Sequence, residues 1–111
     1  MMIVKKHRTL SESRRSDITG SLMSKFNFRL DNCSLVEVGD DGSWLITARY
    51  HPKFDFLDLE YHKPEKTLYI LYKISTTDQL NPEEEQFEAY KMPVEANMAS
   101  KRWNSLLRES R

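Results

Sequence analysis

Three strongly apolar segments follow one another in the middle of the chain, and each has the composition of a β-strand. They read SWLITARY at 43–50, FDFLDLEY at 54–61 and TLYILYKIS at 67–75. The short polar breaks between them, HPK and HKPEK, each contain a proline, which a central strand rarely tolerates. Runs rich in β-branched and aromatic residues, joined by such breaks, are typical of an antiparallel β-meander. We therefore predict that the three segments are neighbouring strands of one sheet.

Two weaker segments extend this predicted sheet. CSLVEV at 33–38 leads through the turn sequence GDDG into the first of the three strands, which indicates a hairpin. FEAYKM at 87–92 is a candidate edge strand that ends at Pro93. The segment 26–30 is either a short strand or the frayed end of a preceding helix. The sheet is thus expected to have four or five strands.

Helical periodicity flanks the sheet on both sides. The sequence T-L-S-E at 9–12 has the capping-box pattern with Thr9 as N-cap. Apolar residues then repeat at helical spacing, namely Ile18, Leu22, Met23 and Phe26. Residues 94–110 form a second predicted helix with one apolar side. The predicted fold class is α+β, with an N-terminal helix, a four- to five-stranded antiparallel β-meander and a C-terminal helix.

Length and composition set the domain organisation. A chain of 111 residues suits one domain, here 9–111, preceded by a flexible basic arm at 1–8. Cys33 is the lone cysteine, which excludes an internal disulfide and fits a small buried hydrophobic residue. The N-terminal sequence contains no apolar core of a signal peptide, and no segment is long enough to cross a bilayer. We therefore expect a cytoplasmic protein with no membrane partner.

The alternation of side chains leaves the second face of the predicted sheet half apolar. In segment 54–61, Phe54 and Phe56 fall on this second face together with acidic residues. Tyr69 and Leu71 fall on it from the next strand. Two interpretations remain open: one helix covers each face of the sheet, or these four apolar residues form an exposed patch for a partner.

Charge is unevenly distributed although the formal net charge is zero. Both terminal segments are basic and the middle of the chain is acidic, so the termini are expected to form one basic patch or simply solvated faces. The residues expected to make polar contacts with a protein partner are Arg14, Arg15, Lys101 and Arg102, beside the apolar Phe54, Phe56 and Tyr69. The alternative is a nucleic-acid surface made of Lys5, Lys6, Arg8, Arg14, Arg15, Lys25 and Arg108.

Candidate catalytic or metal-binding residues are few. Asp58, Glu60 and His62 share strand parity, so they either hold a divalent cation or form a solvated polar end of the sheet. His51 and His62 lie at opposite ends of the same predicted strand and cannot share a metal ion. One cysteine and three glycines provide neither a zinc cluster nor a phosphate-binding loop. We therefore predict a protein without catalytic residues, metal or cofactor.

One resemblance concerns the second half of the chain. ARYHPKFDFLDLEYHKPEKTLYILYKIS at 48–75, followed by ANMASKRWNSLLRES at 96–110, resembles the small KTSC domain. The resemblance implies a tyrosine-rich hairpin followed by a helix that carries a serine and an arginine. The glycine expected between the strands is absent and the connector is longer, so no site residue is carried over.

Taken together, these patterns predict a non-enzymatic binding protein. A small α+β domain with segregated charge suits an inhibitor or adaptor of a larger host protein or nucleoprotein machine, as in accessory proteins of phages and mobile elements. A protein partner is the first expectation. The alternative is direct binding of nucleic acid through the basic arm and the two helices.

Overall fold

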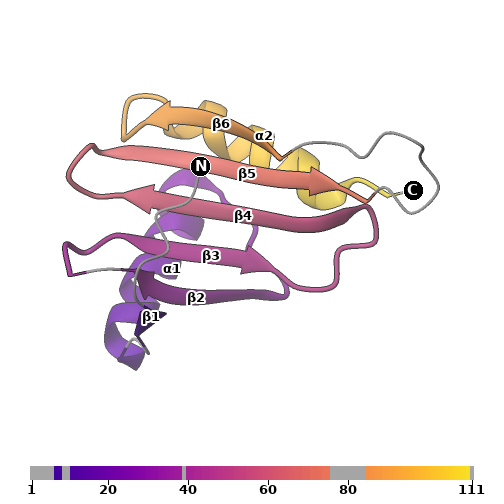
Figure 1. Ribbon diagram of the computed structural model, residues 1–111. Helices are drawn as coiled ribbons and strands as arrows, with labels where there is room; N and C mark the ends of the chain where they lie inside the picture. Colours follow the sequence, from indigo (N-terminus) through magenta and orange to yellow (C-terminus); the bar gives the residue numbers. More distant parts are fainter. Residues whose placement is uncertain (1–6, 9–10, 39, 76–84, 111) are drawn as a thin grey trace.

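An antiparallel sheet forms the body of the molecule, and its strand order follows the chain (Figure 1). The computed structural model describes residues 7–8, 11–38, 40–75 and 85–110, and within these ranges the sheet has six strands. They are β1 (His7–Arg8), β2 (Cys33–Val38), β3 (Trp44–Ala48), β4 (Phe54–His62), β5 (Thr67–Ile74) and β6 (Gln86–Lys91). Helix α1 (Glu12–Phe26) precedes β2, and α2 (Ala96–Arg108) follows β6. The predicted α+β class and order of elements are confirmed.

Strands β2 to β6 correspond to the five segments that the sequence marks as strands. Strand β1 is an addition to them, because His7 pairs with Val38 and Arg8 pairs with Glu37. These two residues are the last of the predicted basic arm. The rest of that arm, residues 1–6, lies outside the described residues.

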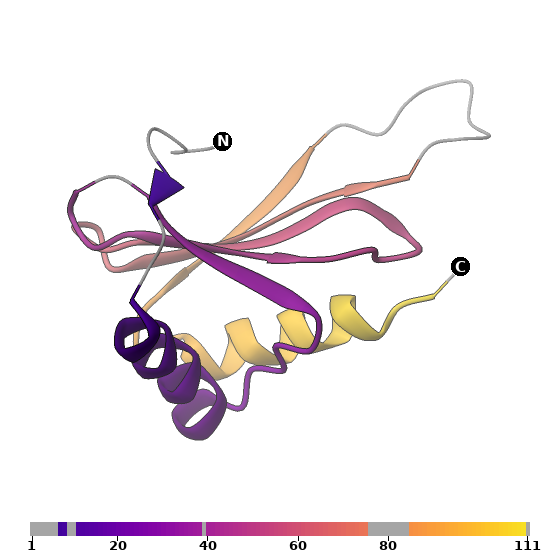
Figure 2. The same cartoon turned by 90° about the horizontal axis from the view of Figure 1, so that it is seen from below.

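Both helices pack on the same face of the sheet, which corrects the expectation of one helix on each face (Figure 2). The reason is geometric. Six strands spaced about 4.8 Å apart make a sheet roughly 24 Å wide, and one helix covers only about 10 Å of it. Leu35, Ile46, Leu59 and Ile70, on four successive strands, are buried on this face. Two helices side by side are needed to cover that surface.

A β-bulge in β4 decides which face Phe54 occupies. Phe54 is opposite Ile74 on β5, whereas Phe56 is opposite Lys73, so Asp55 is an extra residue in the ladder. Strict alternation would place Phe54 with Phe56 on the second face. Because of the extra residue, Phe54 shares the helix-covered face with Leu57 and is 5% exposed. The prediction that Phe54 is part of an exposed patch is therefore wrong.

Helix α1 begins two residues later than the capping-box pattern indicates. Its N-cap is Ser11, whose side chain accepts a hydrogen bond from the backbone N–H of Arg14. Thr9, the predicted cap, lies outside the described residues. The helix ends at Phe26, and Asn27 follows with a left-handed φ of 61°. Met23, expected on the apolar stripe, is instead 47% exposed.

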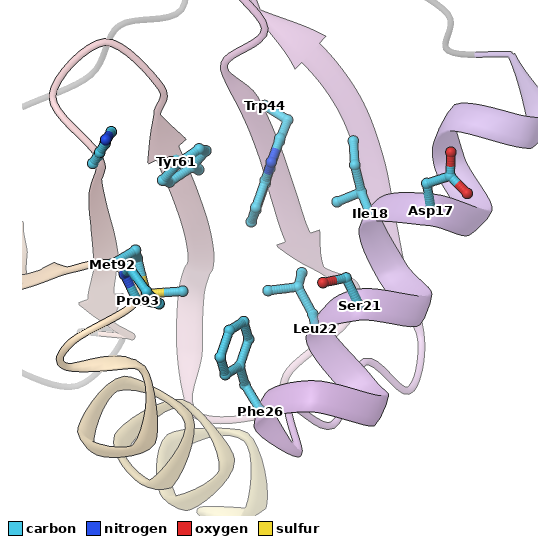
Figure 3. Close-up of a pocket in the computed structure, with 10 residues that line it drawn as sticks. Asp17, Ile18, Ser21, Leu22, Phe26, Trp44, Tyr61, Met92 and Pro93 are labelled. Carbon is cyan, nitrogen blue, oxygen red and sulfur yellow. The ribbon is translucent and has the colours of Figure 1, made fainter.

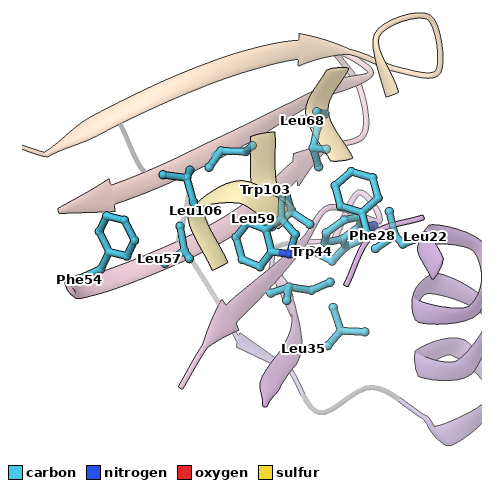
Figure 4. Packing of buried hydrophobic residues seen from close by; sticks show 13 residues of the cluster. Leu22, Phe28, Leu35, Trp44, Phe54, Leu57, Leu59, Leu68, Trp103 and Leu106 are labelled. Atoms are coloured by element: carbon cyan, nitrogen blue, oxygen red, sulfur yellow. The ribbon is translucent and has the colours of Figure 1, made fainter. Parts of the chain in front are cut away.

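Helix α2 closes the core and ties it to the loop after α1. Trp103 is 0% exposed and lies among the buried leucines of the sheet (Figure 4). Its indole N–H donates to the carbonyl of Arg29 at 2.7 Å, which satisfies the buried polar atom. Asn104 accepts from the N–H of Arg29 at 2.8 Å and donates to the carbonyl of Asn27 at 2.9 Å. These bonds join α2 to the segment 27–30, which is neither strand nor helix.

Candidate functional site

A groove opens between α1 and the segment that connects β6 to α2, and it has the sheet as its floor (Figure 3). Its volume is about 490 Å³. Leu22 and Phe26 project into it from α1, and Trp44 and Tyr61 line it from β3 and β4. The far side is formed by the segment that connects β6 to α2. The full lining is Asp17, Ile18, Ser21, Leu22, Phe26, Trp44, Tyr61, Lys66, Met92 and Pro93.

The two sides of the groove are held by hydrogen bonds to the sheet. The guanidinium of Arg14 donates to the carbonyl of Gly42 at 3.3 Å, and that of Arg15 donates to the carbonyl of Leu35 at 3.2 Å. These bonds attach the start of α1 to the β2–β3 hairpin. On the other side, the N–H of Met92 donates to the carbonyl of Lys66 at 2.9 Å. Hydrogen bonds within the folded domain therefore hold both sides of the groove in place.

The surface of this groove is mostly aromatic and aliphatic. The rings of Trp44 and Tyr61 lie 5.5 Å apart between centroids, at a tilt of 33°. Exposed Asp17 and Lys66 are the charged residues among the lining side chains. Such a site can remove large apolar side chains from water and orient them by two opposite charges.

A second group of polar side chains is buried on the face of the sheet opposite the helices. His62 is hydrogen-bonded to Glu60 through Nε2 at 2.9 Å and to Glu65 through Nδ1 at 3.1 Å. The Thr47 hydroxyl donates to Asp58 at 2.5 Å, and burial raises the pKa of the Asp58 carboxyl above its usual value. Asp58, Glu60 and His62 are all buried, so the expectation of a solvated polar end is wrong.

Metal binding by this polar group is not favoured by its geometry. Within the described ranges, no three His, Cys, Asp or Glu side chains are grouped so that they could hold a metal ion. The imidazole of His62 has both nitrogens occupied by carboxylates of Glu60 and Glu65. This arrangement orients the ring in the sheet and leaves it no free nitrogen for a ligand.

Arg102, expected to contact a partner, belongs to an internal network between α2 and the sheet. Its guanidinium donates to Glu88 at 2.9 Å and to the Tyr72 hydroxyl at 3.2 Å. Tyr90 also donates to Glu88, at 2.7 Å. Burial raises the pKa of the Glu88 carboxyl, but hydrogen bonds from Tyr90, Arg102 and Tyr72 outweigh it and hold the pKa below its usual value.

The other residues expected to contact a protein partner are spread over the molecule. Arg14 and Arg15 attach α1 to the sheet, whereas Lys101 is exposed on α2. Phe56 and Tyr69 are half-buried on the second sheet face. Leu71, on the same face, is 1% exposed and adds nothing to an accessible patch.

Among the residues expected to bind nucleic acid, those whose side chains the structure describes are not gathered into one surface. Arg14 contacts Gly42 just before β3 begins, whereas Arg108 lies near Ala48, where β3 ends. Lys25 is exposed near the end of α1. Lys5 and Lys6 lie outside the described residues, as does the side chain of Arg8.

Sequence reasoning also missed residues that the fold brings together. The groove combines a helix stripe, two strand positions and Met92–Pro93, which the sequence places in separate elements. At the other end of β3 a second hollow collects Arg29 and Arg49 beside Arg108. The spacing of these three arginines in the sequence does not indicate that they lie close together, because they come from three different segments.

The comparisons with known proteins leave the function to be argued from this geometry. The chain matches no protein-family model, no curated protein and no solved structure. The resemblance to the KTSC domain gains no support from them. Among the described residues, no helix combines the length and apolar character that crossing a membrane requires.

Proposed function

We propose that this chain is a non-enzymatic protein-binding module, an adaptor or inhibitor whose groove receives an amphipathic helix of a partner protein. The observation that carries the proposal is the apolar hollow between α1, the segment Met92–Pro93 before α2, and the sheet. A groove of this kind matches the helix-in-groove mode of recognition, in which a partner helix inserts apolar side chains at helical spacing into a hydrophobic groove.

The size of the groove supports insertion of side chains rather than of a whole helix. About 490 Å³ lies within the range of roughly 300–1,000 Å³ that is typical of binding pockets. Two or three large apolar side chains fill such a volume. Neighbours at positions i and i+4 of a helix are about 5–6 Å apart, so consecutive turns of one helix can supply them. Aromatic and aliphatic anchors in desolvated pockets provide most of the affinity of protein interfaces.

The charges at the rim favour one kind of helix. Asp17 lies on the α1 side and Lys66 on the turn between β4 and β5, and both are exposed. A partner helix with a basic residue over Asp17 and an acidic residue over Lys66 complements both. Exposed charges of this kind contribute to orientation and association rate more than to affinity.

The test uses a displayed library of random peptides roughly 15 residues long, about four helical turns. Selection is made on the wild type and compared with Ser21→Trp, which fills the groove from its α1 side. The matched control is Ser24→Trp, on the exposed side of the same helix. Selected peptides should carry apolar residues at helical spacing, and Ser21→Trp should weaken their binding at least about tenfold while Ser24→Trp leaves it unchanged.

Two results would overturn the proposal. One is a selection that enriches no peptide family at all. The other is a set of peptides that bind Ser21→Trp as tightly as the wild type. Thermal unfolding of both variants, expected to stay within about 1 kcal/mol of the wild type for sites of this kind, establishes that a loss of binding is not a loss of folding.

A further inference from the structure

A second hollow lies at the opposite end of β3 and β4 from the groove, and its lining is basic. Its volume is about 260 Å³. Arg29 comes from the loop after α1, Arg49 directly follows β3, and Arg108 is the last residue of α2. All three arginines are exposed, and the one acidic residue of the lining is Asp31. The complete lining is Arg29, Asp31, Asn32, Ala48, Arg49, Tyr50, His51, Pro52, Leu107 and Arg108.

The backbone around this basic hollow is fixed from several directions. The N–H of Arg49 donates to the carbonyl of Asn32 at 2.8 Å. The carbonyl of Arg29 accepts a hydrogen bond from the Trp103 indole, and the backbone N–H of Arg29 donates to the side chain of Asn104. The backbone N–H of Lys53 donates to Nδ1 of His51, so the proton of this ring is on Nε2, which donates to the carbonyl of Leu107 at 3.1 Å. His51 thereby covers a carbonyl at the negative end of α2.

Tyr50 is the most unusual residue of the hollow. This residue is 97% exposed, although tyrosines are usually at least partly buried. Its φ is 57°, a left-handed conformation that is a genuine outlier for a bulky side chain. Conformations of this kind cost of order 1–3 kcal/mol and are concentrated at ligand-binding sites. The fold therefore presents an unstacked aromatic ring beside three guanidinium groups.

We propose that this basic hollow, with Tyr50 at its rim, binds single-stranded nucleic acid. Guanidinium forks match phosphate oxygens in geometry, and an exposed aromatic ring stacks an unpaired base. The hollow is somewhat smaller than pockets of roughly 300–1,000 Å³ that take whole ligands, which suits one phosphate with its sugar. Arg29 forms an ion pair with Asp31, with 3.5 Å between the guanidinium nitrogen and the carboxylate oxygen. Both side chains are exposed, so the pair is weak and a phosphate can take the place of the carboxylate. The site shares no lining residue with the groove beside α1.

The test measures binding of a fluorescent single-stranded DNA of mixed sequence, about 12 nucleotides long, by anisotropy. The wild type should bind with an affinity that falls steeply between about 50 and 200 mM salt. Arg49→Gln and Arg108→Gln should each weaken binding about tenfold and make the salt dependence shallower by about 0.7 per lost phosphate contact. The matched control is Lys63→Gln, which removes an exposed positive charge at the far end of β4 and should leave binding within about twofold.

Substitutions of Tyr50 distinguish binding by base stacking from binding by charge alone. Tyr50→Ala should weaken binding by about 5- to 100-fold, whereas Tyr50→Phe should retain it because the ring still stacks. A duplex of the same sequence should bind more weakly than the single strand, since its bases are already stacked. Circular dichroism melting of each variant verifies that it is folded.

Several outcomes would overturn the assignment. One is the absence of binding at low salt, and another is an effect of Lys63→Gln equal to that of Arg49→Gln. Competition by inorganic phosphate at the same phosphate concentration as the oligonucleotide would indicate a general anion site. Equal affinity for polyglutamate would indicate an acidic protein as the ligand. Full binding by Tyr50→Ala would remove the argument from stacking.

Discussion

At the scale of single residues, burial changes the pKa of several ionisable side chains of this domain, and Cys33 is one of them. Burial, and then the negative charge of Asp31, raise the pKa of the Cys33 thiol to about 11. A thiol with so high a pKa is almost entirely protonated near neutral pH and is a poor nucleophile. Cys33 therefore acts as a small hydrophobic residue beside the core, as its isolation in the sequence indicates.

The clearest residue-scale prediction concerns Asp58. Burial holds its pKa above the usual 3.8, so the charged carboxylate lowers the stability of the fold at pH values above the folded pKa. This cost disappears as the pH falls toward the unfolded value. Asp58→Asn keeps an acceptor for the Thr47 hydroxyl and should therefore raise the urea midpoint at pH 7. The gain should shrink as the pH is lowered toward about 4; a gain of the same size at both pH values would contradict this explanation.

At the scale of elements, the β-bulge in β4 decides which residues of this strand face the helices. Residues of β4 after Asp55 alternate regularly, with Leu57 and Leu59 toward the helices and Asp58 and Glu60 away from them. Asp55 shifts this alternation by one position, so Phe54 turns toward the core. An apolar residue that counting places on the outer face thus becomes part of the hydrophobic cluster.

Deletion of Asp55 tests this role of the bulge. Removing the extra residue should produce a regular ladder in which Phe54 still faces the helices, so the protein should fold with a loss of at most about 2 kcal/mol. The matched control is deletion of Asp58 in the regular part of the strand, which reverses the faces on one side of the deletion and should prevent folding. Cooperative unfolding followed by circular dichroism distinguishes the two. Equal damage by both deletions would show that Asp55 is not the extra residue.

At the scale of the whole molecule, α2 joins parts of the chain that are far apart in sequence. Asn104 binds both Asn27 and Arg29 through its side chain, and Trp103 binds Arg29 as well. These contacts set the position of α2 relative to the loop after α1. They therefore influence the basic hollow, which is lined by Arg29 from this loop and by Leu107 and Arg108 from α2.

Asn104→Ala tests this connection. The substitution removes the side-chain partner of the Arg29 N–H and of the Asn27 carbonyl, and it should lower the free energy of unfolding by about 0.5–1.5 kcal/mol because water can reach both groups. Ser105→Ala, at the exposed neighbouring position, should change it by less than about 0.5 kcal/mol. Urea unfolding followed by circular dichroism and by tryptophan fluorescence gives both values. An Asn104→Ala protein as stable as Ser105→Ala would contradict the role assigned to Asn104.

The sequence by itself determined both helices, strands β2 to β6 and their order, but not β1. Alternating β-branched and aromatic residues between proline-containing breaks predicted the strands of the meander, and helical spacing predicted both helices. These signals are local, because the side-chain periods of strands and helices depend on the backbone geometry of each segment. The α1 side of the groove was predictable in the same way, since Ile18, Leu22 and Phe26 form one apolar stripe.

Tertiary structure decided the remaining features. Asp55 shifts the face of Phe54, and both helices gather on one side of the sheet. It also brings Arg29, Arg49 and Arg108 together from three segments. Each of these depends on which distant segments pack against one another, and that choice minimises exposed apolar surface over the whole chain rather than within any one element. No local pattern of residues contains that information.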